Sequence, residues 1–240
     1  MIHRRINIWT VLLVSTAFVP EESQAEEWNY SVTPYLWAPS LDTSLDIGPN
    51  PPVEGSGSIL DFIDGAFLIA GEARRGPWSI FGELNYLNLK DEFGTSTTGT
   101  VAEWSVKGTM GSLGAAYAFH DRQDVRVEGL AGLRGWNIDI ATTVLAAEAS
   151  TSESWVDPFL GLRFEAPLAE QVNISGMANV GGFGVGSDQQ WEAIAQVKWS
   201  VSDLVTLSGG YRHLYLDFSD GGSVIDFTMS GPFVAVGFTF

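Results

Sequence analysis

The sequence has no cysteine, three histidines, and no long apolar run after residue 19. Without cysteine the chain can form neither a disulfide framework nor a thiolate metal site, and it cannot carry a lipid on an N-terminal cysteine. Lysine and arginine number 12 against 29 acids, giving a net charge of −17, and there is no basic patch of the kind that binds nucleic acid. Because no later stretch approaches the roughly 20 apolar residues of a membrane helix, spanning by helices is excluded as well.

The N-terminus has the order of a secretory signal peptide. The basic start "MIHRR" is followed by the apolar run Ile6–Val19, and then by small residues at the two positions that determine cleavage, Ser23 and Ala25. The alternative is a buried N-terminal helix. We predict a signal peptide over residues 1–25 and an exported domain over residues 26–240.

The rest of the chain alternates apolar and polar residues in short segments separated by turn residues, which is typical of β-strands. The segment "QWEAIAQVKW", residues 190–199, shows this alternation most clearly. We predict an all-β fold, an antiparallel transmembrane barrel of about ten strands, with eight or twelve also compatible. The strands lie near 28–38, 65–74, 78–90, 100–119, 125–138, 153–166, 172–184, 188–200, 204–218 and 223–240. In the fourth, the apolar parity switches near Gly108–Gly111, and we interpret the switch as a β-bulge.

Alternation does not say which face points inward, and a soluble extracytoplasmic β-domain is the alternative to a membrane barrel. Short connections near 75–77, 120–124, 167–171 and 201–203 are interspersed with long ones near 39–64, 91–99 and 139–152. Aromatic residues mark the strand ends beside the short turns: Trp78, Tyr117, Phe119, Phe164 and Trp199. An aromatic girdle and unequal connections favour a membrane barrel with short periplasmic turns and longer outer loops.

The final segment "GPFVAVGFTF" places Phe238 and Phe240 on one apolar strand face. It resembles the C-terminal signal that the barrel assembly machinery of Gram-negative bacteria recognises, so both residues are expected to serve in assembly. The segments "TPYLWAP", "WVDPFLGLRF", "GGFGVGSD", "GGYRHLYLD" and "TMSGPF" resemble a family of small Gram-negative outer-membrane β-barrel proteins, mostly of unassigned activity. The resemblance implies location in the outer membrane, contact with its lipids, and no catalytic residue to carry over.

Charged residues on the polar strand faces are expected to point into the lumen. These are Glu72, Arg74, Glu83, Glu103, Lys107, Arg126, Glu128, Arg134, Asp157, Arg163, Glu165, Glu192, Lys198 and Arg212. Their signs balance, whereas the connections toward the outer mouth are strongly acidic. Charges in a narrow lumen are costly unless they are paired, so the network is either a structural plug or the wall of a narrow polar path. The segment Ser58–Gly71 is either a lid over the mouth or a strand extension.

No pattern of residues predicts an enzyme, a cofactor or a metal site. His120 is expected in a turn, and His213 on a strand near its outer end, where a cross-strand serine or aspartate could still pair with it. The leading functional prediction is a narrow channel for ions or small solutes with an acidic, cation-attracting outer mouth. The alternative is a non-conducting barrel for envelope integrity or surface interaction, and the third is a hydrolase that uses His213.

Overall fold

The structure, a computed structural model, describes residues 27–47, 53–95, 100–122, 124–144, 147–220 and 223–240. The predicted signal peptide lies outside these residues. No helix in the described ranges is long and apolar enough to cross a membrane.

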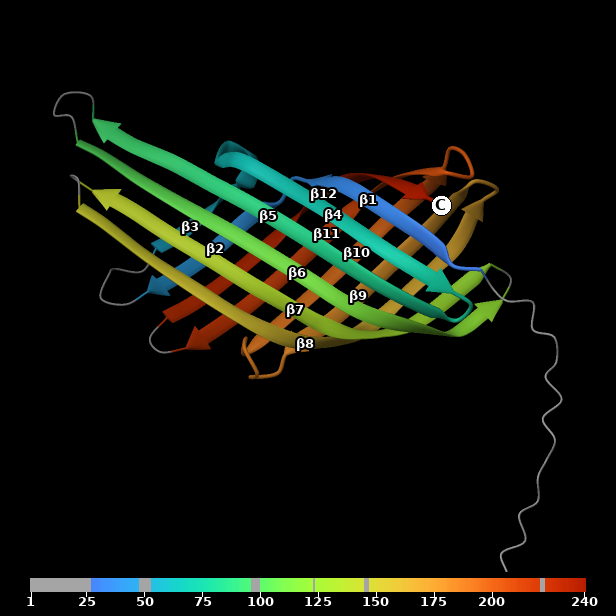
Figure 1. The fold of residues 1–240 in the computed structure, drawn as a ribbon. Helices are drawn as coiled ribbons and strands as arrows, with labels where there is room; N and C mark the ends of the chain where they lie inside the picture. Colours follow the sequence, from blue (N-terminus) through green and yellow to red (C-terminus); the bar gives the residue numbers. More distant parts are fainter. Residues whose placement is uncertain (1–26, 48–52, 96–99, 123, 145–146, 221–222) are drawn as a thin grey trace, which may run out of the picture.

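Twelve β-strands and a short 3₁₀ turn make up the described chain (Figure 1). They are β1 Asn29–Trp37, β2 Ser40–Ile47, β3 Val53–Ser58, η1 Ile59–Asp61, β4 Ile63–Arg75, β5 Trp78–Thr95, β6 Thr100–Arg122, β7 Val125–Val144, β8 Ala147–Ala169, β9 Val172–Gly182, β10 Gln189–Ser200, β11 Val205–Asp220 and β12 Ser223–Thr239. Every pairing is antiparallel, and β1 pairs with both β4 and β12. The ring of β1 and β4 to β12 is therefore a closed ten-stranded barrel, and the predicted fold class and strand number are confirmed.

Closure of the barrel ties down both ends of the described chain. The backbone of Tyr30 exchanges hydrogen bonds of 2.9 and 3.0 Å with that of Phe240. We call this end of the barrel, where β1 begins and β12 finishes, the terminal end, and the opposite end the hairpin end. A strand that pairs on both sides leaves no free edge, which is why the last residues remain ordered.

The hairpin end contains more strand than the sequence predicts. β5 and β6 pair out to Thr95 and Thr100, and β7 and β8 pair out to Val144 and Ala147. The expected long connections at 91–99 and 139–152 are therefore mostly β-structure, because their polar and small residues also alternate. The connection at 39–64 contains β2 and β3, which extend the sheet beyond β12. Within the candidate lid, η1 buries Ile59, and β4 begins at Ile63.

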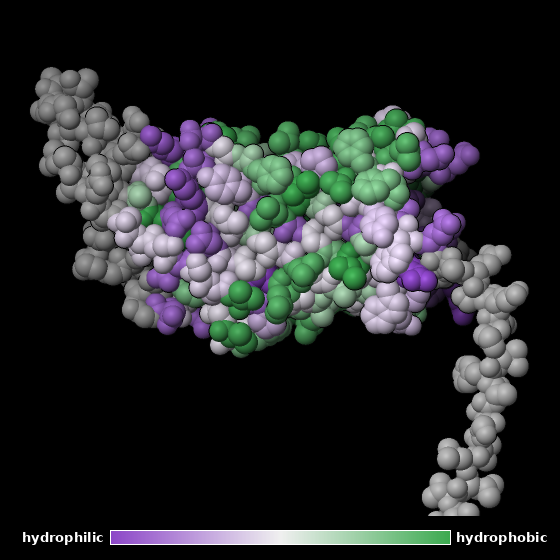
Figure 2. Space-filling view, in the orientation of Figure 1, coloured by the Kyte–Doolittle hydropathy of each residue, from purple (hydrophilic) through white to green (hydrophobic). Residues whose placement is uncertain are grey.

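Around the terminal half of the barrel, the outer face is apolar. The exposed residues here include Val234, Val236 and Phe238 on β12, Phe240 directly after it, and Leu113 on β6. Figure 2 shows hydrophobic residues gathered around the middle of the barrel, with hydrophilic residues toward its ends. A tilted strand crosses a bilayer with roughly 9–11 residues, and β1, the shortest strand of the ring, has 9.

The pattern reverses toward the hairpin end, where the interior is apolar. On β11, Leu214, Leu216 and Phe218 are buried, and so are Phe227 and Met229 on β12. They belong to one hydrophobic cluster with Ile225 of β12 and with residues from β1, η1 and β4 to β7, namely Trp37, Ile59, Leu68, Leu89, Met110, Trp136 and Ile138. We call this cluster the apolar core.

Aromatic rings hold the apolar core together across the barrel. Trp155 of β8 stacks on Phe218 of β11 with ring centroids 4.0 Å apart, although β9 and β10 lie between these strands in the sheet. Trp136 of β7 meets Phe227 of β12 edge to face at 5.8 Å. The barrel wall is shorter at β9 and β10, because β9 ends at Gly182 and only a short loop leads to β10. Side chains of β8 and β11 therefore meet beyond this loop.

The reversal corrects the predicted bulge at Gly108–Gly111. β6 pairs with β5 and β7 without interruption through these residues, and its register shift lies at Ala118/His120. Trp104 and Val106 are apolar because they pack against the apolar core in the interior, whereas Leu113 belongs to the apolar outer face of the terminal half. The apolar residues change from even to odd positions because the surroundings of β6 change along its length. The backbone of β6 continues without a bulge at this point.

Candidate functional site

A charged layer crosses the interior directly beneath the apolar core. Glu192 is fully buried, and its carboxylate lies 2.6 Å from the guanidinium groups of both Arg134 and Arg212, which are 2% exposed. Arg212 also binds Glu83 at 2.6 Å and donates to the Tyr35 hydroxyl at 2.7 Å. The layer therefore joins β1, β5, β7, β10 and β11 through one network.

A second group of ion pairs lies closer to the terminal end. Arg163 of β8 binds Glu72 at 2.7 Å and Glu128 at 2.5 Å. Arg126 binds Glu128 at 2.9 Å and also contacts Asp121, and Arg74 binds Glu72 at 3.1 Å. Two residues beyond Arg163 on β8, Glu165 binds Lys198 of β10 at 2.5 Å. Each of these lumen charges has a partner of opposite sign.

Two residues of the expected lumen network have surroundings other than those predicted. Asp157 is fully buried, but its carboxylate accepts hydrogen bonds from the Ser187 amide and hydroxyl at 2.7 and 2.6 Å and from the Trp155 indole, and no arginine pairs with it among the described residues. Lys107 is exposed on the face of β6 that continues into Leu113, so its predicted lumen position is wrong. The side chain of Glu103 lies outside the described residues.

Sequence reasoning missed the neutral members of the charged layer. Arg134 donates to Ser112 at 3.1 Å and to Gln190 at 3.3 Å, and Asn179 donates to Glu192 at 2.9 Å. Some buried atoms remain without a hydrogen bond in the described structure, among them Nδ2 of Asn85 and Nε of Arg212. A buried charged layer is costly to build, and its ion pairs and hydrogen bonds recover part of that cost.

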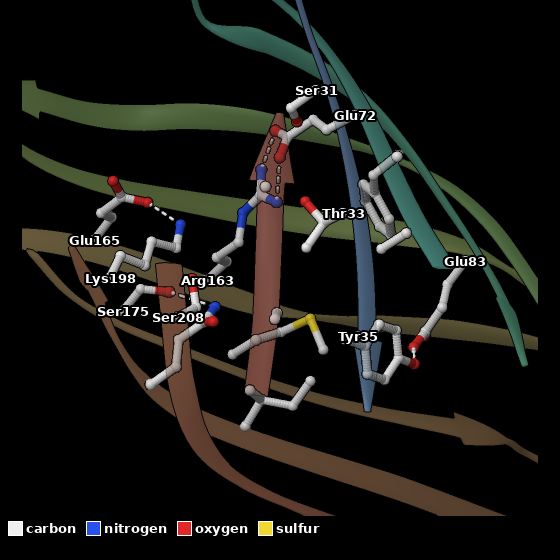
Figure 3. Close-up of a pocket in the computed structure, with 18 of the residues that line it drawn as sticks. Ser31, Thr33, Tyr35, Glu72, Glu83, Arg163, Glu165, Ser175, Lys198 and Ser208 are labelled. Atoms are coloured by element: carbon white, nitrogen blue, oxygen red, sulfur yellow. Dashed lines mark hydrogen bonds and ion pairs between the residues drawn. The ribbon is translucent and has the colours of Figure 1, made fainter. Parts of the chain in front are cut away.

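Between the charged layer and the terminal end lies a cavity of about 380 Å³, which we call the vestibule. Its rim includes Asn29, Ser200 and Thr239, and its deep end includes Tyr35, Glu83 and Arg212. One wall carries the ion pairs of Arg163 and Lys198, and Figure 3 shows serine and threonine side chains lying opposite and beside them. The vestibule is therefore polar, opens at the terminal end, and ends below the apolar core.

Comparison with known proteins rests on structure alone. No protein-family model matches the chain, and no curated protein sequence does either. The outer-membrane protease OmpT from Escherichia coli matches with a TM-score of 0.54 and 11% identity, covering 90% of this chain and 98% of that one. This chain has the fold of an outer-membrane β-barrel.

Two further barrels are more distant. The translocator domain of the autotransporter NalP from Neisseria meningitidis has a TM-score of 0.47 and 13% identity, covering 92% of this chain and 90% of that one. The attachment invasion locus protein Ail of Yersinia pestis, in complex with a heparin analogue, has a TM-score of 0.43 and 10% identity, covering 90% and 99%. Both likenesses are too weak to add to the fold.

In this outer-membrane barrel the expected aromatic girdle residues lie on the outside near the terminal end. Trp78, Tyr117, Phe119, Phe164 and Trp199 are all exposed, and Trp78 packs on Tyr117 with centroids 4.7 Å apart. Phe238 and Phe240 are exposed on the same outer surface. Such rings fit the interface between lipid tails and water.

His213 lies on the outer face near the upper limit of the apolar belt. Its ring stacks on Trp191 at 4.2 Å, and its Nδ1 is 2.6 Å from the Ser230 hydroxyl. Within the described residues no carboxylate binds this ring, and no three metal-ligating side chains come together. A serine and a histidine in contact are two parts of a nucleophilic site, but the group that orients the base is not among their contacts here.

Proposed function

We propose that the protein is a non-conducting integral protein of the Gram-negative outer membrane. Its barrel would anchor a compact β-sheet extension, formed by the hairpin end, above the outer leaflet. The apolar core carries this proposal, because it packs Leu216, Phe227 and Trp136 into the interior at the hairpin end. An apolar constriction expels water, and ions do not pass a dry constriction.

The orientation follows from the connections. At the hairpin end β5 to β8 run far beyond the apolar outer face and β2 and β3 widen the sheet, and in outer-membrane barrels the longer segments face the cell exterior. The vestibule would then open to the periplasm, and the hairpin end would face the cell exterior. A role in envelope integrity or surface interaction fits a barrel that is closed toward the outside.

A narrow channel is the second candidate, and the vestibule favours it. The charged layer and the vestibule together make the membrane-embedded interior polar, as a permeation path requires. Conduction would need the apolar core to part, for example by separation of Trp155 from Phe218, which now stack at 4.0 Å.

Planar-bilayer recording of the refolded wild-type protein distinguishes the two candidates. We expect no conductance steps, with a wide porin in the same bilayer as the positive control. Reproducible steps from the wild-type protein, with a selectivity that changes in Arg163→Ala, would overturn the non-conducting proposal in favour of the channel.

A further inference from the structure

We propose that the vestibule binds a small, uncharged, hydroxyl-rich solute with the size and chemistry of a mono- or disaccharide. This inference does not rest on a closed lumen, because the vestibule opens at the terminal end whether or not ions pass the apolar core. Its volume of about 380 Å³ lies near the lower end of the range for small-molecule sites, roughly 300–1,000 Å³.

The hollow exists because β12 presents very small side chains to it. Ala235 and Gly237 both line the vestibule. A Cβ atom placed on Gly237 would lie 3.3 Å from the hydroxyl of Thr33 on β1 and 3.8 Å from Cβ of Thr206 on β11. A side chain at position 237 would therefore crowd these two threonines, and glycine keeps this part of the vestibule wall thin.

This wall presents hydroxyl groups that are available for hydrogen bonds to a ligand. Ser31, Thr33, Thr206, Ser208 and Thr239 line the vestibule from β1, β11 and β12. Within the described part of the chain, none of these hydroxyls makes a side-chain hydrogen bond to another residue. Each can both donate to and accept from a ligand, and this dual capacity matches the hydroxyls of a sugar.

The charged wall argues against an ionic ligand. Glu72 is held by Arg163 at 2.7 Å, and Glu165 by Lys198 at 2.5 Å. A charged ligand would have to separate one of these pairs and leave a partner uncompensated in a confined space. An uncharged hydroxyl ligand can instead accept hydrogen bonds from the cationic groups and donate to the carboxylates without disturbing the pairs.

The deep end supplies apolar surface for the C–H faces of a sugar ring. Phe81 and Phe159 line the vestibule with centroids 6.3 Å apart, and Met177 packs against the same small cluster. Apolar and aromatic lining with a few placed polar groups is the usual composition of a small-molecule site. Hydroxyls on one side and rings at the bottom together suit a solute with both polar edges and apolar faces.

The test is a calorimetric titration of the refolded full chain with maltose and with di-N-acetylchitobiose, in a detergent that lacks a sugar head group. We expect saturable binding of at least one of them, and none of citrate or spermidine at equal concentration. The variant Thr33→Val/Thr206→Val keeps side-chain volume but removes two hydroxyls, and should weaken binding about tenfold or more. Thr228→Val is the matched control, because Thr228 lies on β12 outside the vestibule, and it should bind as wild type does.

Ser208→Trp should abolish binding by filling the space, and the heat-dependent gel shift of each variant reports whether its barrel has folded. Longer oligosaccharides separate two sources of the ligand. If a hexasaccharide competes equally, the site takes the end of a glycan chain, and if only short sugars bind, it takes a free solute. Absence of saturable sugar binding, preference for either charged ligand, or unchanged affinity in the folded double-valine variant would overturn the proposal. A protein that binds sugar but also conducts would overturn only the non-conducting function.

Discussion

Replacing Glu192 by glutamine removes the carboxylate that Arg134 and Arg212 share in the charged layer. Arg212 keeps Glu83 at 2.6 Å, but Arg134 is left with the neutral partners Ser112 and Gln190. The change therefore leaves one guanidinium, 2% exposed, without a counter-charge. Breaking a buried ion pair on one side costs about 3–5 kcal/mol, so we expect Glu192→Gln to lose stability in that range.

The assay is urea unfolding in phospholipid vesicles, followed by tryptophan fluorescence. Glu165→Gln is the matched control, because Glu165 has Lys198 as its ion-pair partner and both side chains are about a quarter exposed, at 26% and 27%. Exposed pairs contribute about 0.2–1 kcal/mol, so this variant should lie near wild type.

A second substitution tests whether the loss of stability comes from the uncompensated charge of Arg134 or from the altered packing. Adding Arg134→Met to Glu192→Gln removes the uncompensated guanidinium and should restore much of the lost stability, since a buried pair can often be replaced by apolar groups. If Glu192→Gln unfolds within about 1 kcal/mol of wild type, or no more easily than Glu165→Gln, then the charged layer is hydrated and the reasoning is wrong.

Three further outcomes are expected. Arg163→Ala frees a carboxylate of Glu128 from a 2.5 Å contact and should cost roughly 1–3 kcal/mol in the same assay, without adding conductance in bilayers, because the apolar core stays in place. Phe240→Asp should reduce folded barrel in outer-membrane fractions far more than Thr239→Ser; equal yields would mean that the outward face of β12 is misassigned. At the hairpin end, burial and two neighbouring carboxylates raise the pKa of Asp217 above its usual range, so its ionised form destabilises the fold as pH rises through that pKa. Asp217→Asn should therefore unfold at a higher temperature than wild type at pH 7, and the difference should vanish below about pH 4.

Strand positions could be read from the sequence because alternation records burial directly. In β10, Ala195, Val197 and Trp199 face outward and Lys198 inward, and the pattern and structure agree residue by residue. The same holds for Arg134 of β7, which is buried in the interior while the adjacent Leu133 is exposed on the outer face. Where one strand face meets lipid and the other a polar interior, alternation with a period of two is sufficient to identify the strand and to assign its two faces.

The sequence did not predict side-chain surroundings that depend on a distant residue or on the medium around a strand, because neither leaves a signal in the neighbouring residues. No residue near Asp157 in the sequence indicates that Ser187 of the β9–β10 loop will bind it. The contact depends on the shape of that loop, with positive φ angles of 86°, 55° and 71° at Gly182, Phe183 and Gly184. Strand parity predicts a lumen position for Lys107 only if the same medium surrounds the whole length of β6. The hydroxyl wall of the vestibule gave no signal either, since single serines and threonines also occur on solvent faces.

A single physical boundary accounts for the errors along β6 and for the closed interior. On β7, Leu133 faces outward and Trp136 inward, and on β12, Val234 faces outward and Phe227 inward, with unbroken pairing between them. Two strands on different parts of the wall thus exchange their apolar face at the same level, and a common change of surroundings explains this more simply than independent bulges. Below that level lipid covers the apolar face, so the interior can be polar and hold the charged layer. Above it water covers the outer face, so the apolar side chains must bury one another inside, and the apolar core that closes the barrel follows from the strands extending past the membrane.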